Sequence, residues 1–519
     1  MRLPHLKNVR VVVSLLVFVI AAGMFLDFTG NFPRDVASTV TSVQVGPSLI
    51  RILTTIAWPA LGLGIALILT IAFGRVYCSS LCPLGTLQDI LSRLNRNRNS
   101  RRRFRFRRQY YLLHYALLLL ASALALGGSI MLITLLEPFS TFGRLTVELA
   151  RPAAVLLHNG AALVLDAVAV YSLFAVPLHV APLGPLLVTI LLLAVLFVMS
   201  YRAGRLFCNT LCPVGAILGL ISRVSVFRIV FDRSLCSDCG LCEKVCKAGC
   251  IDSKRMSVDF SACVGCFNCM EVCPTSGVLF ERRYGSRNVT AALPVDRRRR
   301  KMLQDAAAMV AGSAIMPGDS LKAVLPPATG KSRTTRPITP PGSRGLDHFT
   351  SRCTACHLCV SACPTQILTP VFLDYGLDGI LQPCMDYEIG SCSYDCVVCG
   401  EVCPSGAILP LPVETKKLVQ IGKATFIKDE CIVVTKKTDC GACAEHCPTK
   451  AVRMVPYEGR LRIPELNNDL CIGCGACEHP CPTTPNKAIY VEANPVHLIA
   501  KKPEEKKIEV KEEGAEFPF

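Results

Sequence analysis

Long apolar runs separated by short polar stretches fill the first 230 residues of the chain. Four of these runs come close to, or exceed, the roughly 20 residues that a helix needs to cross a bilayer. The four runs are Val11–Phe28, Ile52–Phe73, Tyr110–Leu136 and Leu183–Tyr201. We therefore predict an α-helical membrane domain of four spanning helices over residues 1–230.

Two apolar stretches need separate interpretation. Val11–Phe28 has the length of a signal peptide, but it lacks a clear small-x-small cleavage site, so we interpret it as a retained anchor. Ala153–Leu178 is also apolar, yet it carries His158 and Asp166. We interpret this stretch as a folded or interfacial segment and not as a fifth span.

Charge in the loops predicts the orientation of the membrane domain. The chain has a net charge of +17, and Ser92–Arg108 holds nine arginines and no acid. Such a run also occurs in nucleic-acid-binding proteins, but its place between two predicted spans favours the positive-inside rule. We therefore expect the N-terminus, Ser92–Arg108 and two C-x3-C-P segments, Cys78–Pro83 and Cys208–Pro213, on the cytoplasmic side, and no nucleic-acid partner.

Cysteine usage changes the picture beyond the apolar region. The chain has 519 residues and 30 cysteines, whereas disulfide-dense scaffolds are usually short and secreted. Four runs have the spacing C-x2-C-x2-C-x3-C, which is the bacterial ferredoxin pattern: Cys236, Cys239, Cys242 and Cys246; Cys263, Cys266, Cys269 and Cys273; Cys353, Cys356, Cys359 and Cys363; Cys471, Cys474, Cys477 and Cys481. Two looser runs keep C-x2-C-x3-C-P at the end: Cys392, Cys396, Cys399 and Cys403; Cys431, Cys440, Cys443 and Cys447.

This spacing predicts the ligands of [4Fe–4S] clusters. Three close thiolates bind one cluster and the fourth binds its neighbour, so six runs of four supply 24 thiolates for six clusters. In the first segment this crossover places Cys273 with the Cys236 run. It likewise places Cys246 with the Cys263 run. Zinc sites instead use two cysteine pairs with a long gap between them, which fits this spacing poorly.

One run also fits a competing motif. Cys353-Thr-Ala-Cys356-His357 has the C-x-x-C-H form of a c-type haem attachment site, with His357 as the axial ligand. Cys359 and Cys363 follow at ferredoxin spacing, which a haem site does not need. We therefore favour a cluster here, with His357 as a loop residue beside it.

An internal repeat adds four cysteines in the membrane domain. Gly74–Gly85 matches Gly204–Gly215, and each copy carries the motif C-x3-C-P directly after a predicted span. The motif places two thiols one helical turn apart. The four cysteines are Cys78, Cys82, Cys208 and Cys212. They form either buried structural pairs or, jointly, one further metal centre, and the sequence leaves both interpretations open.

A basic junction separates the two cysteine-rich regions. Arg297–Arg300 precedes a mildly apolar stretch, Ala306–Met316, and a proline-rich linker, Pro317–Arg344. Twin arginines before such a stretch are typical of a Tat export signal, although an ordinary basic linker has the same composition. On the export hypothesis, the region that follows, His348–Phe519, lies in the periplasm.

These features divide the chain into five parts. We expect the four-helix membrane domain at 1–230, a two-cluster ferredoxin domain at 231–285, the Arg-rich Tat-like segment and linker at 286–347, a four-cluster polyferredoxin domain at 348–498, and a charged tail at 499–519. The predicted fold class is an α-helical membrane domain plus α+β ferredoxin-like [4Fe–4S] domains.

The C-x3-C-P motifs and the first ferredoxin segment resemble the NapH-type membrane subunits of quinol dehydrogenases, whose paired motifs also occur in NosR-type proteins. Residues 297–519 resemble the NapG-type, Tat-exported polyferredoxin, so the chain resembles a fusion of the two. For the second block the resemblance implies that the first cysteine run pairs with the fourth and the second with the third. The chain departs from the pattern at Lys247, where proline usually follows the fourth cysteine, and in the extra Cys250 and Cys384.

The resemblance and the cluster count together imply a membrane-anchored electron-transfer protein of the bacterial inner membrane. Electrons would pass from the quinol pool, with quinone as substrate, through the clusters to a terminal reductase or cytochrome partner. No catalytic site of its own is evident, since the sequence has neither a G-x-G-x-x-G after a strand nor a Walker A motif. The alternatives are a flavin- or molybdenum-dependent reductase and an iron–sulfur regulator or assembly factor of a respiratory oxidase or reductase.

Quinol oxidation releases protons, so we expect a base at the level of the membrane. The candidates are Glu137, Asp166, His114, His158 and His179. Each of them also fits the role of an interfacial or helix-end polar residue.

Overall fold

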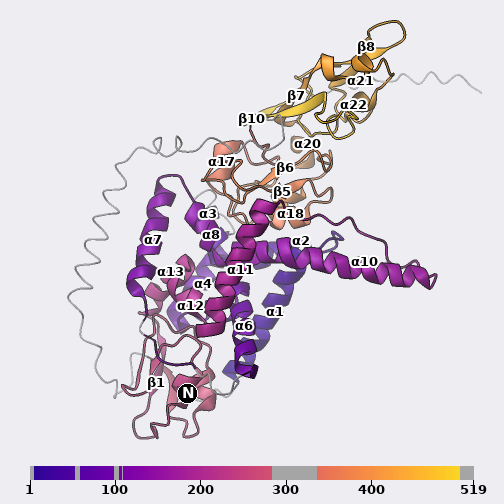
Figure 1. The fold of residues 1–519 in the computed structure, drawn as a ribbon. Helices are drawn as coiled ribbons and strands as arrows, with labels where there is room; N and C mark the ends of the chain where they lie inside the picture. The colour runs from indigo at the N-terminus through magenta and orange to yellow at the C-terminus, as the bar shows by residue number, and fades with distance from the viewer. Residues whose placement is uncertain (1–4, 53–58, 99–103, 108, 283–335, 503–519) are drawn as a thin grey trace, which may run out of the picture.

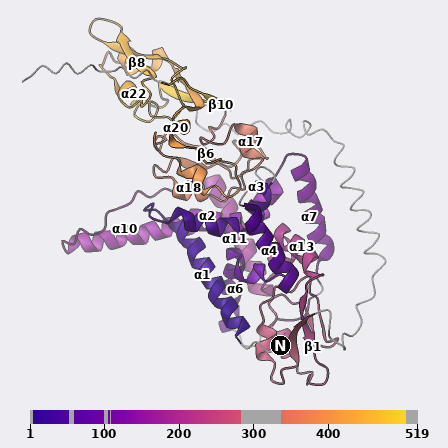
Figure 2. The ribbon, with the colours of Figure 1, turned by 180° about the vertical axis from the view of Figure 1, so that it is seen from behind.

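The computed structural model describes residues 5–52, 59–98, 104–107, 109–282 and 336–502. These residues form a helical bundle with a small cysteine-rich lobe (227–282, the first lobe) at one end. A larger cysteine-rich lobe (336–502, the second lobe) lies at the opposite end (Figure 1). Figure 2 shows the same order from behind. The predicted Tat-like segment, including Arg297–Arg300 and Ala306–Met316, lies outside the described residues.

Four apolar helices run along the bundle: α1 (Leu6–Leu26), α4 (Pro59–Phe73), α7 (Tyr111–Leu126) and α11 (Leu183–Ala203). Among the described residues, α1 and α11 are the two helices long and apolar enough to cross a membrane. Gly62–Phe73 and Tyr111–Leu126 are apolar but shorter. Two candidate spans give the predicted membrane domain limited support.

The prediction of one continuous segment over Tyr110–Leu136 is wrong. Helix α7 ends at Leu126, and a second helix, α8, covers Met131–Leu136. The residue pair Gly127–Gly128 separates them, and Gly128 has a φ of 87°. Glycine adopts this left-handed conformation without steric cost and therefore ends helices readily.

The stretch Ala153–Leu178 forms a helix and a returning strap. Helix α10 (Arg151–Ala167) projects sideways from the bundle near the second lobe, and the strap 168–182 leads back to α11 (Figure 1). Apolar side chains such as Leu157 and Phe174 are each 77% exposed. The helix lies across the bundle axis, as expected of a folded or interfacial segment.

The two copies of the repeat lie at the bundle end that meets the first lobe. In the first copy α5 (Tyr77–Ser80) is followed by α6 (Pro83–Arg98), and in the second α12 (Leu206–Thr210) is followed by α13 (Pro213–Ser222). The proline of each motif opens the second helix, a position where its missing N–H costs nothing. The remaining bundle elements are α2 (Arg34–Ser42), α3 (Val45–Ile52), α9 (Pro138–Leu145) and the π-helical turn η1 (Thr146–Ala150).

Both lobes are built from two-stranded antiparallel sheets and short helices. The first lobe contains β1 (Phe227–Phe231) paired with β4 (Val278–Arg282), β2 (Ile251–Asp252) paired with β3 (Ser257–Val258), α14 (Leu241–Lys244) and α15 (Asn268–Val272). In the second lobe the sheets are β5 (Leu368–Pro370) with β6 (Pro383–Met385), β7 (Val419–Phe426) with β10 (Ile489–Ile499), and β8 (Val452–Pro456) with β9 (Arg462–Leu466). Its helices are α17 (Leu346–Thr350), α18 (Leu358–Ala362), α19 (Val398–Val402), α20 (Val413–Lys416), η2 (Lys428–Glu430), α21 (Ile432–Thr435) and α22 (Ala442–Glu445).

Candidate metal centres

The first lobe gathers its thiols into two quartets. Cys236, Cys239, Cys242 and Cys273 line one pocket. Burial raises the pKa of Cys269, and negative charge on Cys266, Cys263 and Cys246 raises it further, which places these four thiols together. This is the crossover grouping that the ferredoxin spacing predicts.

Left-handed backbone turns bring the close thiols of a run onto one side. Asp238 and Gly240 have φ values of 52° and 65° between the cysteines of the first run. In the third run the corresponding residues, Ala355 and His357, have φ values of 49° and 62°. Successive turns of this kind make concave loops suited to anionic iron–sulfur groups. His357 is therefore a loop residue between two cysteines, and its Nε2 contacts the Leu381 carbonyl oxygen at 2.8 Å.

In the second lobe the first run groups with the second. Burial raises the pKa of Cys359, and the negative charge on Cys353, Cys356 and Cys403 adds to it. Burial likewise raises the pKa of Cys399 above its usual range, with Cys392 and Cys363 among the charges that add to it. Helices α18 and α19, which carry the two runs, pack against each other.

The third run groups with the fourth. Cys431, Cys440, Cys443 and Cys481 line one pocket. Burial and the charge of Cys447 both raise the pKa of Cys471 and of Cys477. The pairing of first with fourth and second with third, which the family resemblance implied, is therefore wrong. Runs adjacent in sequence pair instead, because each pair folds locally, so the second lobe consists of two consecutive modules with two thiol quartets each.

The donor sets suit iron–sulfur clusters. The pocket of the Cys431 run has about 360 Å³ of empty space and is lined by four thiols, apolar side chains and Thr483. The pocket of the Cys236 run has about 410 Å³. Four thiolates without imidazole ligands are the usual environment of a [4Fe–4S] cluster. Within the described ranges, no group of three or more His, Cys, Asp or Glu side chains is placed to hold a single metal ion.

The repeat cysteines form a further quartet inside the bundle. Cys78, Cys82, Cys208 and Cys212 are each at most 4% exposed. Burial raises the pKa of Cys212, and negative charge on Cys208, Cys78 and Cys82 raises it further. The structure thus brings together two pairs of thiols that lie about 130 positions apart in the sequence.

Two buried arginines cross between the copies of the repeat. Arg75 of the first copy donates to the Cys208 carbonyl oxygen at 2.9 Å, and Arg205 of the second copy donates to the Cys78 carbonyl oxygen at 2.6 Å. Gly85 and Gly215 leave room for these two crossed hydrogen bonds, because a Cβ at either position would overlap the carbonyl oxygen that accepts one of them. The four thiols therefore lie on a local pseudo-twofold axis between the two copies.

The environment of Arg75 favours an anionic group at the four-cysteine site. Its guanidinium donates to Asn209 Oδ1 at 2.8 Å and to the Ser261 carbonyl oxygen at 2.9 Å, and it lies 4.0 Å from Cys78 Sγ. These two oxygens and the Cys208 carbonyl oxygen are all neutral, whereas a buried cation needs a counter-charge. Thiolates bound to a metal centre would supply that charge.

Asp89 links the bundle to the first lobe. Its carboxylate lies 2.9 Å from Arg205, 3.4 Å from Arg10 and 3.2 Å from Lys247 Nζ. Burial alone would raise the pKa of Asp89, but these cations, Arg205 first among them, lower it well below its usual range. Lys247 stands where proline usually follows the fourth cysteine, so this departure serves to dock the first lobe on the bundle.

The two extra cysteines lie in different environments. Cys250 Sγ is 3.5 Å from Cys246 Sγ, so it is a fifth thiol beside the second quartet of the first lobe. Cys384 lies on β6, where burial raises its pKa to about 12 and keeps it protonated at neutral pH. Cys384 is therefore a structural thiol.

The five candidate bases do not form one site. Glu137 caps α9 and accepts from the backbone N–H groups of Phe139 and Ser140. His114 contacts the Cys212 carbonyl oxygen at 3.0 Å inside the bundle, while His158 contacts the Phe174 carbonyl oxygen at 3.1 Å on the exposed α10. Asp166 is exposed on the same helix.

His179 lines a pocket between the bundle and the second lobe, together with Glu148. Glu148 was not among the predicted residues. An acid within an apolar stretch was the signal that could have identified it.

Comparison with family models identifies iron–sulfur domains along the chain. A 4Fe–4S binding domain matches residues 54–102 and 184–231, which contain the two copies of the repeat. Two 4Fe–4S dicluster domains match residues 259–367 and 437–484. The chain therefore carries ferredoxin-type 4Fe–4S domains.

Several curated proteins are similar to part of the chain. The putative electron transport protein YccM of Escherichia coli is 28% identical over 214 residues, which is 41% of this chain and 52% of YccM. The ferredoxin-type protein NapH of Haemophilus influenzae is 28% identical over 42% of this chain and 67% of NapH. The methylamine utilization ferredoxin-type protein MauN of Paracoccus denitrificans is 29% identical over 37% of this chain and 55% of MauN.

These relatives support the NapH-like part of the predicted fusion, and the NapG-like part stays a prediction. The chain spans about half the length of YccM, so the activity of the whole protein is a matter of proposal. No solved structure matches the chain. Its homologues are ferredoxin-type electron-transport proteins.

Proposed function

We propose that the chain is a membrane-embedded iron–sulfur conduit that carries electrons from a hydroquinone through its clusters to a partner reductase or cytochrome. The observation that carries this proposal is the placement of the cysteine quartets. Quartets lie in the first lobe, in the repeat of the bundle and in the second lobe, and the two lobes lie at opposite ends of the bundle (Figure 1).

At the first lobe, a cluster-binding loop lies directly on the repeat. Arg75 donates to the Ser261 carbonyl oxygen at 2.9 Å, and Ser79 Oγ donates to the Gly265 carbonyl oxygen at 3.5 Å. Ser261 and Gly265 flank Cys263, while Ser79 follows Cys78. The Cys263 quartet is therefore next to the four-cysteine site.

Tyr77 and Glu137 connect the four-cysteine site to the other end of the bundle. Burial raises the pKa of Tyr77, and the charges of Cys82 and Glu137 are among those that raise it further. Burial also raises the pKa of Cys356 to about 12, and Glu137 again contributes. Glu137 therefore lies between the repeat and the first quartet of the second lobe.

The second lobe continues the series outward. Cys392 N donates to the Cys474 carbonyl oxygen at 2.9 Å, so the loop of the second run lies on the loop of the fourth. Tyr387 lies between them and donates its hydroxyl to the Gly473 carbonyl oxygen. Cys443 adds to the charges that raise the pKa of Cys477. The quartets therefore follow one another, and that of the Cys431 run is the outermost.

In this proposal each [4Fe–4S] cluster, when bound, supplies a site that takes up and releases one electron. The residues of the chain hold the clusters and set their potentials. Arg75 and Arg205 place positive charge beside the four-cysteine site, which favours the more negative, reduced form of a metal centre. In this proposal the four-cysteine site in the bundle holds a further metal centre, which is one of the two interpretations that the sequence of the repeat leaves open.

The placement of the lobes supports opposite sides of the membrane. Phe104 N and Arg107 N, which belong to the arginine-rich stretch, donate to the Lys244 and Gly249 carbonyl oxygens of the first lobe. The positive-inside rule assigns such a stretch to the cytoplasm. With the bundle spanning the inner membrane, the first lobe is cytoplasmic and the second lobe is periplasmic.

Iron and sulfide analysis of the anaerobically purified chain tests this proposal. Six clusters correspond to about 24 irons, and a [4Fe–4S] cluster at the four-cysteine site adds about four. Turnover with a quinol analogue, followed by EPR of the reduced clusters, then separates a conduit from a regulator. A total of about eight irons or fewer would contradict the proposal.

A further inference from the structure

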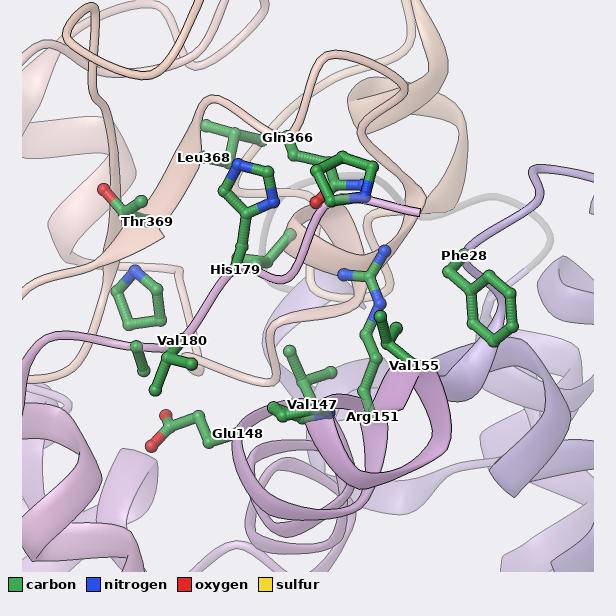
Figure 3. A pocket seen from close by; sticks show the side chains of 15 residues that line it. Phe28, Val147, Glu148, Arg151, Val155, His179, Val180, Gln366, Leu368 and Thr369 are labelled. Carbon is green, nitrogen blue, oxygen red and sulfur yellow. The ribbon is translucent and has the colours of Figure 1, made fainter. Parts of the chain in front are cut away.

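A pocket lies where the bundle meets the second lobe (Figure 3). It has about 590 Å³ of empty space and opens on one side. Phe28, Val147 and Val155 line it from the bundle, and Val360 and Leu368 line it from the second lobe. Such a mostly apolar cavity with a few polar groups is typical of small-molecule sites.

The pocket lies at the root of the sideways helix. Val155 belongs to α10, and Val180 belongs to the strap that returns from its tip. The outward side chains of this helix and strap are apolar, with Leu157 and Phe174 each 77% exposed. An apolar helix lying across a bundle of spanning helices is suited to the membrane interface. A ligand dissolved in the bilayer can therefore reach the pocket from the side.

Glu148 is the unusual residue of this pocket. It is only 3% exposed, and neither carboxylate oxygen accepts a hydrogen bond in the described structure. An imidazole nitrogen, His357 Nδ1, lies 3.2 Å from Oε1. Buried carboxylates normally have donors, as Glu137 does from two backbone N–H groups. A ligand hydroxyl would supply the donor that Glu148 lacks.

The local backbone also singles out Glu148. It lies in the π-helical turn η1, between α9 and α10. Single π-helical turns inside helices occur frequently at functional sites. Glu148 is one of the residues that line the pocket, and it lies below the strap that carries His179 (Figure 3).

The pocket adjoins a cluster-binding loop. Val360, which lines the pocket, directly follows Cys359 of the first quartet in the second lobe. Arg151 reaches across from α10 and donates to the Ser361 carbonyl oxygen at 3.2 Å. A ring bound in the pocket is therefore next to the cluster that the quartet would hold.

From these observations we infer that the pocket is the hydroquinone site and that Glu148 is the base that takes a proton from the bound ring. The inference rests on the proposed conduit function and adds the place where electrons enter. When a hydroquinone becomes a quinone, two O–H bonds break and two electrons leave. A [4Fe–4S] cluster, if held by Cys353, Cys356, Cys359 and Cys403, would supply the one-electron acceptor that takes these electrons one at a time. One proton goes to Glu148, and the other goes through the exposed His179 to water.

Binding of a fluorescent quinol analogue, 2-heptyl-4-hydroxyquinoline N-oxide, tests the pocket in the full chain held in lipid nanodiscs. Quenching should saturate with the unsubstituted chain. Val155→Trp fills the pocket and should weaken binding at least tenfold. Leu157→Trp is the matched control, because it adds the same ring to the exposed face of the same helix. Both variants should retain the iron content and the dithionite-reduced spectrum of the unsubstituted chain.

Glu148→Gln tests the proton acceptor separately. The amide keeps the shape of the side chain but not its basicity, so analogue binding should change less than about threefold. Cluster reduction by a water-soluble naphthoquinol should slow on the order of 100-fold, the lower range for loss of a general base. Asp166→Asn, on the exposed part of α10, should leave both measurements unchanged.

The outcomes distinguish the inference from the proposed function. Quinol reduction of the clusters that survives Val155→Trp, with analogue binding unchanged, overturns the pocket while the conduit stands. The unsubstituted chain is also measured. If dithionite reduces its clusters but quinol does not, and if it binds no analogue, the proposal that electrons enter from quinol is contradicted. Normal quinol reduction in Glu148→Gln overturns the role of Glu148.

Discussion

The quartets of the lobes and the four-cysteine site of the bundle hold thiols in different ways. In the lobes, the four runs with C-x2-C-x2-C spacing each supply three thiols from one short loop with left-handed residues, as in the Cys236 run, and part of the set is exposed, as Cys239 is. In the bundle, Cys82 and Cys212 come from two copies of a repeat, and all four thiols are buried.

The difference between these sites is electrostatic as well as topological. Thiols of both kinds of site accept from backbone N–H groups, Cys273 from Gly277 N at 3.2 Å and Cys212 from Gly215 N at 3.3 Å. The bundle site has in addition two buried guanidinium groups, Arg75 and Arg205, each of which donates to a carbonyl oxygen of the other copy. In a low-dielectric interior, such charges act strongly on an anionic centre. If the proposed conduit holds, the bundle site is where the chain would control the passage of electrons between the lobes.

Loss of the bundle site gives the largest expected effect. Cys82→Ser combined with Cys212→Ser leaves two thiols, too few for a cluster, so iron content should fall by about four per chain. The lobe clusters should keep their EPR signals. Cys384→Ser, at a partly buried cysteine outside every quartet, is the control and should lose no iron. If the double variant and the unsubstituted chain contain the same amount of iron, the four cysteines are structural pairs and hold no cluster.

Pairing within the second lobe is tested by double variants. Cys359 and Cys403 share a quartet, so Cys359→Ala with Cys403→Ala should lose one cluster, about four irons. Cys399 belongs to the neighbouring quartet, so Cys399→Ala with Cys403→Ala should lose two, about eight irons. Loss of about eight irons in both double variants would restore the pairing implied by the family resemblance.

Docking of the first lobe gives an intermediate effect. Lys247→Met leaves Asp89 without one of its cations, and breaking a buried ion pair costs on the order of 3 kcal/mol. Guanidinium-induced loss of cluster absorbance measures the change, with the exposed Lys254→Met as control. The pKa of Asp89 is lowered in the folded state, so its contribution is complete above about pH 4 and is lost as the pH falls below that. A midpoint that matches the Lys254→Met control would argue against docking by Lys247.

The smallest effect concerns the potential of the bundle site. Arg75→Gln removes one positive charge 4.0 Å from Cys78 Sγ. At an effective dielectric constant of 20, this lowers the reduction potential of a centre held there on the order of 100 mV. A redox titration followed by EPR measures it, and Arg255→Gln, on the exposed surface of the first lobe, is the control. An unchanged potential would show that Arg75 serves packing alone.

Local spacing was enough to predict several of these features. The crossover of Cys246 and Cys273 follows from the length of each run, and the repeat was visible because its two copies match residue by residue. The grouping of all four repeat thiols was not predictable, because the sequence does not reveal how the copies face each other. The structure supplies that information, because Arg75 and Arg205 each donate a hydrogen bond to a carbonyl oxygen of the other copy.

Other features depend on contacts between parts distant in sequence. Lys247 was visible as a departure from the family pattern, but its partner Asp89 lies in another domain. The importance of Glu148 comes from its burial against His357, more than 200 positions away. The helix break was an error of a different kind, since Gly127–Gly128 was present in the sequence and its helix-ending tendency was outweighed by the apolar pattern.

The most direct test of the conduit is electron transfer across a sealed bilayer. The full chain is inserted into liposomes that contain trapped ferricyanide, and a membrane-impermeant photoreduced deazaflavin is supplied outside. The account predicts loss of ferricyanide absorbance with the unsubstituted chain. It predicts only the rate of protein-free liposomes with the double variant Cys82→Ser and Cys212→Ser, although its outer clusters are still reduced. Equal ferricyanide loss in the two proteins, or no loss in either, would contradict a path through the four-cysteine site.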